Sequence, residues 1–283
     1  DPKTRRAHEV LEGHYPEVGD AAEAIFHANR LDWERGVMEW EEVFDKALEK
    51  SRYGECESLL GVRDELWVKS DFRLGWISEL EGDYYAQLAR YAEAEKEYLE
   101  AVAAYDRELM LTPDDDSTLN NKGNTLLCLG KLQARLSEFE AAKQSYSEAI
   151  AALNSVLIIA PDNNYALNNK GNALQSLGDL QSQLSEFEAA KQSYSEAIAA
   201  YNSALLIAPD FIYALNNKGI ALRSLGDLQE KLSERQEALK NWQEALEMFD
   251  RSLAIAPNDD SVRNRRDALQ EYLDNLGEDT VSS

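Results

Sequence analysis

The chain has 283 residues and a formal net charge of −24, from 53 acidic and 29 basic side chains. This excess of negative charge disfavours nucleic acid and anionic membranes as partners. No apolar run approaches the roughly 18 residues of a membrane span, and no signal-peptide pattern is present. We therefore expect a cytoplasmic location, with Cys56 and Cys128 as reduced thiols. The chain opens on Asp1 without a Met, which fits either a fragment of a longer protein or processing.

Residues 1–64 are predicted to form an N-terminal helical segment that does not follow the repeat described below. The spacing of apolar residues predicts helices at about residues 4–13, 18–29, 33–51 and 55–60. Asp20 and Asp32 are expected to cap the second and third of these helices, because an Asp side chain accepts hydrogen bonds from first-turn amides.

From about residue 65 the sequence repeats with a period of 48 residues. The prolines that keep this step are Pro113, Pro161, Pro209 and Pro257, and the glycines are Gly75, Gly123, Gly171 and Gly219, with Gly82, Gly130, Gly178 and Gly226 as a second series. A fixed period of this size indicates a stack of identical structural units, which forms one continuous body.

Each unit is predicted to be a pair of antiparallel helices, at about residues 163–183 and 186–207 in the most regular copy. Ser185 and Glu188 have the spacing of a capping box at the start of the second helix, and Ser137 and Glu140 repeat it. We predict four such units over residues 65–256, a single polar capping helix over 257–276 and a flexible tail over 277–283.

The landmarks of one unit resemble the tetratricopeptide repeat, with 14 residues added to the usual 34. The matching residues are Leu167, Gly171, Leu174, Gly178, Asp179, Ala197, Tyr201, Ala204 and Pro209. The resemblance implies an all-α fold, a right-handed α-solenoid of antiparallel helix pairs. Residues 1–64 resemble the family only weakly and would be a degenerate version.

In this family one face of each first helix lines a concave groove. At 100° per residue from Gly171, the offsets −6, −3, −2, +1 and +4 fall within about 120° of arc. From these offsets the predicted peptide-binding residues are Arg73, Asn120, Asn121, Asn124, Tyr165, Asn168, Asn169, Asn172, Tyr213, Asn216, Asn217, Arg223 and Arg265. Such a ladder of side-chain amides, closed by arginines, can pair with both polar groups of a peptide bond. The alternative is that these Asn residues bridge neighbouring helices.

Cochaperones of the family grip a C-terminal carboxylate with Lys, Asn and Arg, and Asn124 and Asn172 match one clamp Asn. The clamp Lys, three residues before the glycine, is Asn in this sequence. Lys122, Lys170 and Lys218 do not replace it, because their offset of −1 points them away from the groove. The departure argues against a carboxylate clamp.

Residues 5–40 resemble the helical arm that follows the winged helix in STAND signalling ATPases, which often carry repeat arrays as sensors. No phosphate-binding loop is present, and the three histidines lack a helical metal spacing. We therefore expect no enzyme activity, cofactor or metal. The predicted function is a protein-interaction module, the sensor or scaffold of a larger signalling protein, and the alternative is a self-assembly or autoinhibitory solenoid that contacts its parent chain.

Overall fold

The computed structural model describes residues 2–15 and 20–281. These residues form helices joined by short turns and contain no strand, so the prediction of an all-α fold is confirmed. The chain divides into two compact units, Asp1–Leu132 and Gln133–Ser283, here called the N-terminal and C-terminal units. The division falls within α7 (Asp116–Arg135), inside the predicted repeat array.

The N-terminal unit contains the shortest helices, α1 to α5. Its elements before α7 are α1 (Pro2–His14), α2 (Ala21–Leu31), α3 (Trp33–Glu49), α4 (Tyr53–Arg63), α5 (Asp71–Gln87) and α6 (Tyr91–Leu111). The two predicted caps are confirmed, since Asp20 accepts from the Glu23 amide and Asp32 from the amides of Glu34 and Arg35. The predicted start of the second helix, at residue 18, lies outside the described residues.

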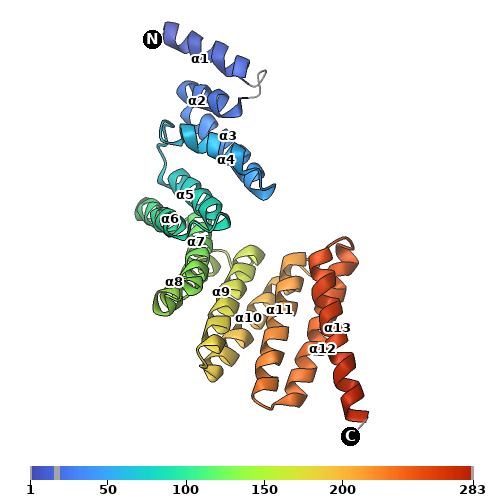
Figure 1. Cartoon of the computed structure of the whole chain (residues 1–283). Helices are drawn as coiled ribbons and strands as arrows, with labels where there is room; N and C mark the ends of the chain where they lie inside the picture. The colour runs from blue at the N-terminus through green and yellow to red at the C-terminus, as the bar shows by residue number, and fades with distance from the viewer. Residues whose placement is uncertain (1, 16–19, 282–283) are drawn as a thin grey trace. The chain divides into compact units, whose positions relative to one another are not determined.

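The C-terminal unit is a regular stack of long helices. It contains α8 (Phe139–Ile159), α9 (Asn164–Gln183), α10 (Phe187–Ile207), α11 (Ile212–Lys231), α12 (Arg235–Ile255) and α13 (Asp260–Val281). The first helices α9, α11 and α13 form one layer, and α10 and α12 lie behind them (Figure 1). The bounds of α9 and α10 agree with the predicted pair to within one residue. Helix α13 runs to Val281, beyond residue 276, and residues 282–283 of the predicted tail lie outside the described part.

The turn inside each helix pair differs from the prediction. Ser185 has a positive φ of 63°, and Ser51, Ala89, Ser137 and Ser233 share this left-handed conformation. The Glu186 amide donates to the Gln181 carbonyl, which is the hydrogen bond of a Schellman motif ending the preceding helix. The N-cap of α10 is therefore Glu186, without a side-chain cap, and the predicted capping boxes at Ser137 and Ser185 are wrong.

The two glycine series seat aromatic rings of the second helix. A Cβ at Gly171 would lie 2.4 Å from the Tyr201 ring, and one at Gly178 would lie 2.9 Å from the Tyr194 ring. In the next repeat, Gly219 faces Phe249 and Gly226 faces Trp242 in the same way. Gly75 and Gly82 face Tyr105 and Tyr98 in the same way, so in these three helix pairs the glycines lie where two large rings leave no room for a side chain.

Gly171→Ala is expected to lower the free energy of unfolding by roughly 1–3 kcal/mol, because the new methyl group must displace the buried Tyr201 ring. Gly61→Ala in α4 is the matched control, since no atom lies within 4 Å of the Cβ it adds. That substitution is expected to stabilise the helix by up to about 1 kcal/mol. Urea unfolding followed by circular dichroism compares the two, and equal effects would contradict the packing argument.

Candidate functional site

One row of polar side chains lies along the first helices of the C-terminal unit. Positions three and four residues apart share a helix face, so the residues that the sequence singled out are aligned on α9 and α11. We call this row the asparagine face, and it comprises Tyr165, Asn168, Asn169 and Asn172 on α9 and Tyr213, Asn216 and Asn217 on α11.

Asn217 connects α11 to α9. Its Nδ2 donates to Asn168 Oδ1 at 3.1 Å and to Asn172 Oδ1 at 2.9 Å. The Tyr201 hydroxyl, from α10, lies 2.8 Å from the same Asn172 oxygen. The alternative role that the sequence left open is thus present, because these amides bridge neighbouring helices and hold the layer together.

The bridging hydrogen bonds leave two polar groups of the asparagine face without a partner among the described residues. These groups are Asn172 Nδ2, a donor, and Asn217 Oδ1, an acceptor, on side chains that are half-buried. They belong to two amides that are already hydrogen-bonded to each other. A neighbouring donor and acceptor match the carbonyl and N–H groups of a peptide backbone.

Aromatic side chains lie at the beginning of both helices. Tyr165 and Tyr213 are 61% and 66% exposed, and Phe211 lies between them at ring-centroid distances of 5.0 and 5.6 Å. Sequence reasoning missed Phe211. The repeat could have revealed it, because Phe211 occupies the N-cap position that Asn163 fills in α9. Unlike Asn163, Phe211 forms no side-chain capping hydrogen bond.

The predicted arginines of the C-terminal unit are engaged with neighbouring side chains. Arg265, on α13, donates to Asn216 Oδ1 at 3.4 Å, and Arg223 lies 3.8 Å from the carboxylate of Asp227. Arg265 therefore extends the polar row from α11 to α13. Arg223 is half-exposed.

The other predicted residues belong to the N-terminal unit. Arg73 forms an ion pair with Glu41 at 2.7 Å, and Asn124 Nδ2 donates to Glu79 at 2.7 Å. Asn120 and Asn121 are half-buried on α7, and the Asn121 carbonyl accepts from the Thr125 hydroxyl. The predicted binding residues are thus divided between the two units.

Two lysines of the Asn-Asn-Lys-Gly motif form ion pairs with a second helix, Lys122 with that of the preceding pair and Lys218 with that of its own pair. Lys122 lies 2.5 Å from Asp106 on α6, and Lys218 lies 2.7 Å from Glu244 on α12 and is buried. Lys122 and Lys218 are thus each held by a carboxylate. The described residues also include no group of three His, Cys, Asp or Glu side chains placed to hold a metal ion.

Two buried glutamates occupy equivalent positions in the N-terminal unit. Glu79 is 2% exposed and accepts hydrogen bonds from Asn124, Thr125 and Tyr105, while Glu41 pairs with Arg73. Burial raises the pKa of each carboxyl to about 7. A step of 38 residues relates Glu41 to Glu79, and it also relates Ser51 to Ala89, which share the left-handed conformation. This step is shorter than the 48-residue period of the later repeats.

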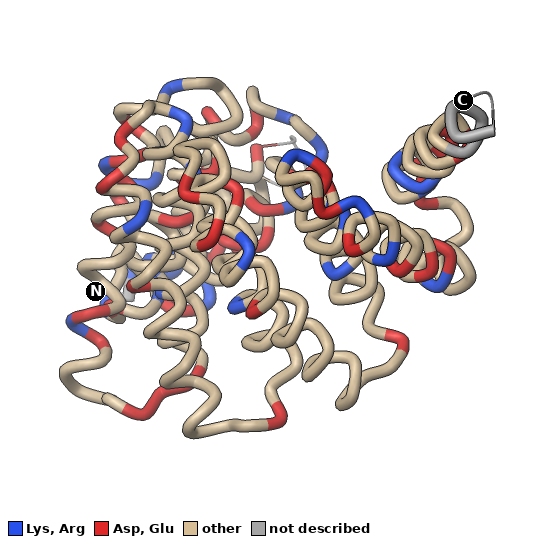
Figure 2. The backbone as a smooth tube through the Cα atoms, turned by 90° about the horizontal axis from the view of Figure 1, so that it is seen from below, with Lys and Arg blue, Asp and Glu red and all other residues tan. Residues whose placement is uncertain are grey.

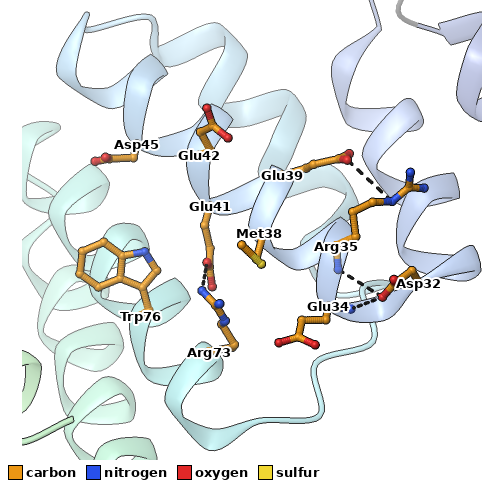
Figure 3. Close-up of a pocket in the computed structure, with 10 residues that line it drawn as sticks. All are labelled: Asp32, Glu34, Arg35, Met38, Glu39, Glu41, Glu42, Asp45, Arg73 and Trp76. Carbon is orange, nitrogen blue, oxygen red and sulfur yellow. Dashed lines mark hydrogen bonds and ion pairs between the residues drawn. The ribbon is translucent and has the colours of Figure 1, made fainter. Parts of the chain in front are cut away.

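A pocket of about 590 Å³ lies between α3 and α5 of the N-terminal unit (Figure 3). Its lining residues are Asp32, Glu34, Arg35, Met38, Glu39, Glu41, Glu42, Asp45, Arg73 and Trp76. Acidic residues also occur along helices throughout the rest of the chain (Figure 2). No helix within the described residues has both the length and the apolar character needed to cross a bilayer.

A family model of the tetratricopeptide repeat matches residues 127–197. No curated protein matches the chain. Among solved structures, BtubC (BKLC) from P. vanneervenii is similar with a TM-score of 0.58 and 15% identity, over 87% of this chain and 90% of that one. The MamA RS-1 ArsTM double mutant gives a TM-score of 0.41 and 16% identity, over 79% of this chain and 97% of its own. The first TPR of Spaghetti (RPAP3), bound to an HSP90 peptide, gives 0.33 and 19%, over 54% and 97%.

These similarities bear on the fold. Residues 127–197 match the tetratricopeptide repeat directly, and the likeness to BtubC extends the same helix-pair architecture over most of the chain. The predicted tetratricopeptide-type α-solenoid is confirmed.

Proposed function

We propose that this tetratricopeptide-type chain is a protein-interaction scaffold whose asparagine face binds an extended segment of a partner protein. The observation that carries the proposal is the adjacent donor and acceptor, Asn172 Nδ2 and Asn217 Oδ1, held in place by their own mutual hydrogen bond at 2.9 Å. Side chains fixed in this way lose little conformational freedom when a peptide group pairs with them.

The exposed aromatic rings supply the second part of the proposed site. Tyr165 and Tyr213 place large, mostly exposed rings at one end of the polar row. Aromatic side chains of this kind contribute much of the binding free energy in protein interfaces. The backbone would thus be held by the amides, and partner side chains would be selected by the tyrosines.

The double variant Tyr165→Ala/Tyr213→Ala is expected to weaken peptide binding at least about tenfold. The ligands are peptides selected from a displayed random library on the immobilised chain, and affinities are measured by fluorescence anisotropy. Because both rings are largely exposed, we expect the free energy of unfolding to change by less than about 1 kcal/mol.

Leu206→Ala is the matched control, since Leu206 is 85% exposed on α10 of the same unit and lies outside the asparagine face. Selected peptides that bind the double variant as tightly as the wild type would contradict the proposal. Asn217→Ala is a poorer probe, because it also removes the two hydrogen bonds that connect α11 to α9.

The alternative is self-association of the solenoid, which makes sedimentation depend on protein concentration in the absence of any peptide. None of the similarities above supports the further prediction that the chain is the sensor of a STAND signalling ATPase. That parentage, like the role in a signalling protein, stays a prediction.

A further inference from the structure

The pocket between α3 and α5 has a floor that is partly aromatic and partly acidic. Glu41 and Met38 come from α3, and Arg73 and Trp76 from α5 (Figure 3). All belong to the N-terminal unit, so the pocket is built without the asparagine face of the C-terminal unit.

Negative charge in this pocket exceeds the positive charge that the chain supplies. Six carboxylates line it against two guanidinium groups. Both guanidinium groups are already engaged, Arg73 with Glu41 at 2.7 Å and Arg35 with Glu12 at 2.7 Å. Among the described residues, no basic side chain forms an ion pair with Glu34 or Asp45.

A second, independent observation concerns Glu41, which is 6% exposed. Its Oε2 accepts from Arg73, but its Oε1 is buried and has no hydrogen-bond partner among the described residues. A buried carboxylate oxygen without a donor is unfavourable, because it has lost its water and gained nothing in exchange. A donor brought by a ligand would remove this penalty.

The aromatic ring and the thioether in the pocket indicate which kind of donor group a ligand would carry. Trp76 is half-buried, and Met38 is 49% exposed. The face of an indole ring attracts a cation, and a guanidinium group combines positive charge with a flat, weakly hydrated surface that stacks on aromatic rings. An ammonium group is more strongly hydrated and lacks the planar fork that matches a carboxylate.

We propose that this pocket binds an arginine side chain of a partner protein, with the guanidinium group donating to Glu41 and Asp45 and stacking on Trp76. The excess of carboxylates selects a cation, the missing donor at Glu41 selects a group that donates hydrogen bonds, and the indole ring selects guanidinium over ammonium. This site shares no residue with the asparagine face and would accept its own segment of a partner.

The test uses the whole chain and the probe acetyl-Arg-Arg-Arg-Arg-amide. NMR titration follows the indole N–H signal of Trp76, which is assigned by its loss in Trp76→Phe. We expect this signal to shift on addition of the probe, and acetyl-Lys-Lys-Lys-Lys-amide to bind at least about fivefold more weakly.

The double variant Glu34→Gln/Asp45→Asn is expected to weaken binding of the tetra-arginine probe at least about fivefold. The control Glu188→Gln/Glu196→Gln removes the same charge from exposed positions on α10 and is expected to change affinity less than about twofold. Circular dichroism establishes that both variants are folded.

Three results would overturn the assignment: no shift of the Trp76 signal, equal binding of the lysine and arginine probes, or equal loss in the two double variants. The last would mean that the probe responds only to the net charge of −24. The double variant Tyr165→Ala/Tyr213→Ala leaves this pocket intact. A negative result for arginine binding in the pocket can therefore be distinguished from a negative result for peptide binding at the asparagine face.

Discussion

Trp242→Ala is expected to lower the free energy of unfolding by about 3–5 kcal/mol. The Trp242 side chain is 1% exposed and packs in the core of α11, α12 and α13, in edge contact with Tyr272. Its Nε1 donates to Asp227 at 2.9 Å, and its ring fills the space over Gly226. Alanine would leave a cavity above a glycine, which has no side chain to fill it, and would remove the donor from Asp227.

The preceding repeat provides the control for this prediction. There Tyr194 occupies the same position over Gly178, and its hydroxyl donates to Asp179 at 2.7 Å. Trp242→Tyr can therefore retain both the ring packing and the hydrogen bond, and its expected cost is only about 1–2 kcal/mol. Urea unfolding followed by far-UV circular dichroism measures both variants, and a tyrosine variant as unstable as the alanine variant would refute the equivalence of the two positions.

Stability is expected to fall by roughly 2–3 kcal/mol per buried glutamate as the pH rises from about 4.5 to 7. For Glu79, burial raises the pKa of the folded state to about 7, from an ordinary value of 4.5. Between these values the folded chain holds a proton that the unfolded chain has lost. The stabilising contribution is therefore complete below about pH 4.5, is lost as the pH rises through 7, and changes no further above it.

Glu79→Gln tests this expectation, because glutamine keeps the shape of the side chain and does not ionise. The Tyr105 and Thr125 hydroxyls can accept as well as donate, so they can reorient toward the new amide. The variant should lose Glu79's share of the pH dependence, while Glu41 and Glu81, whose pKa values burial also raises to about 7, keep theirs.

Unfolding free energies at pH 5, 6, 7 and 8 and constant ionic strength provide the measurement. Glu188→Gln removes one charge from the exposed surface of α10 and controls for net charge. If Glu79→Gln has the same pH dependence as the wild type, the Glu79 carboxyl is not the titrating group.

The sequence was sufficient for the repeat architecture because the signals involved are local. Helix spacing of apolar residues, Asp20 and Asp32 as caps, and the 48-residue return of Pro and Gly act within one helix pair. The helix bounds of α9 and α10 follow from them to within one residue. The glycines that contact Tyr201 and Trp242 also belong to the 48-residue period, so the sequence identified them without identifying the rings they face.

The features that sequence reasoning missed or left open depend on the neighbouring helix. Ser185 reads as a capping residue in isolation, but the Schellman turn that ends α9 places it in the left-handed conformation instead. The sequence pattern predicts that Asn217 lines the groove. Only the packing of α11 on α9 brings Asn168 and Asn172 close enough to accept hydrogen bonds from its side-chain amide. The unpartnered oxygen of Glu41 arises in the same way, because desolvation depends on which helices enclose a carboxylate and not on its place in a pattern.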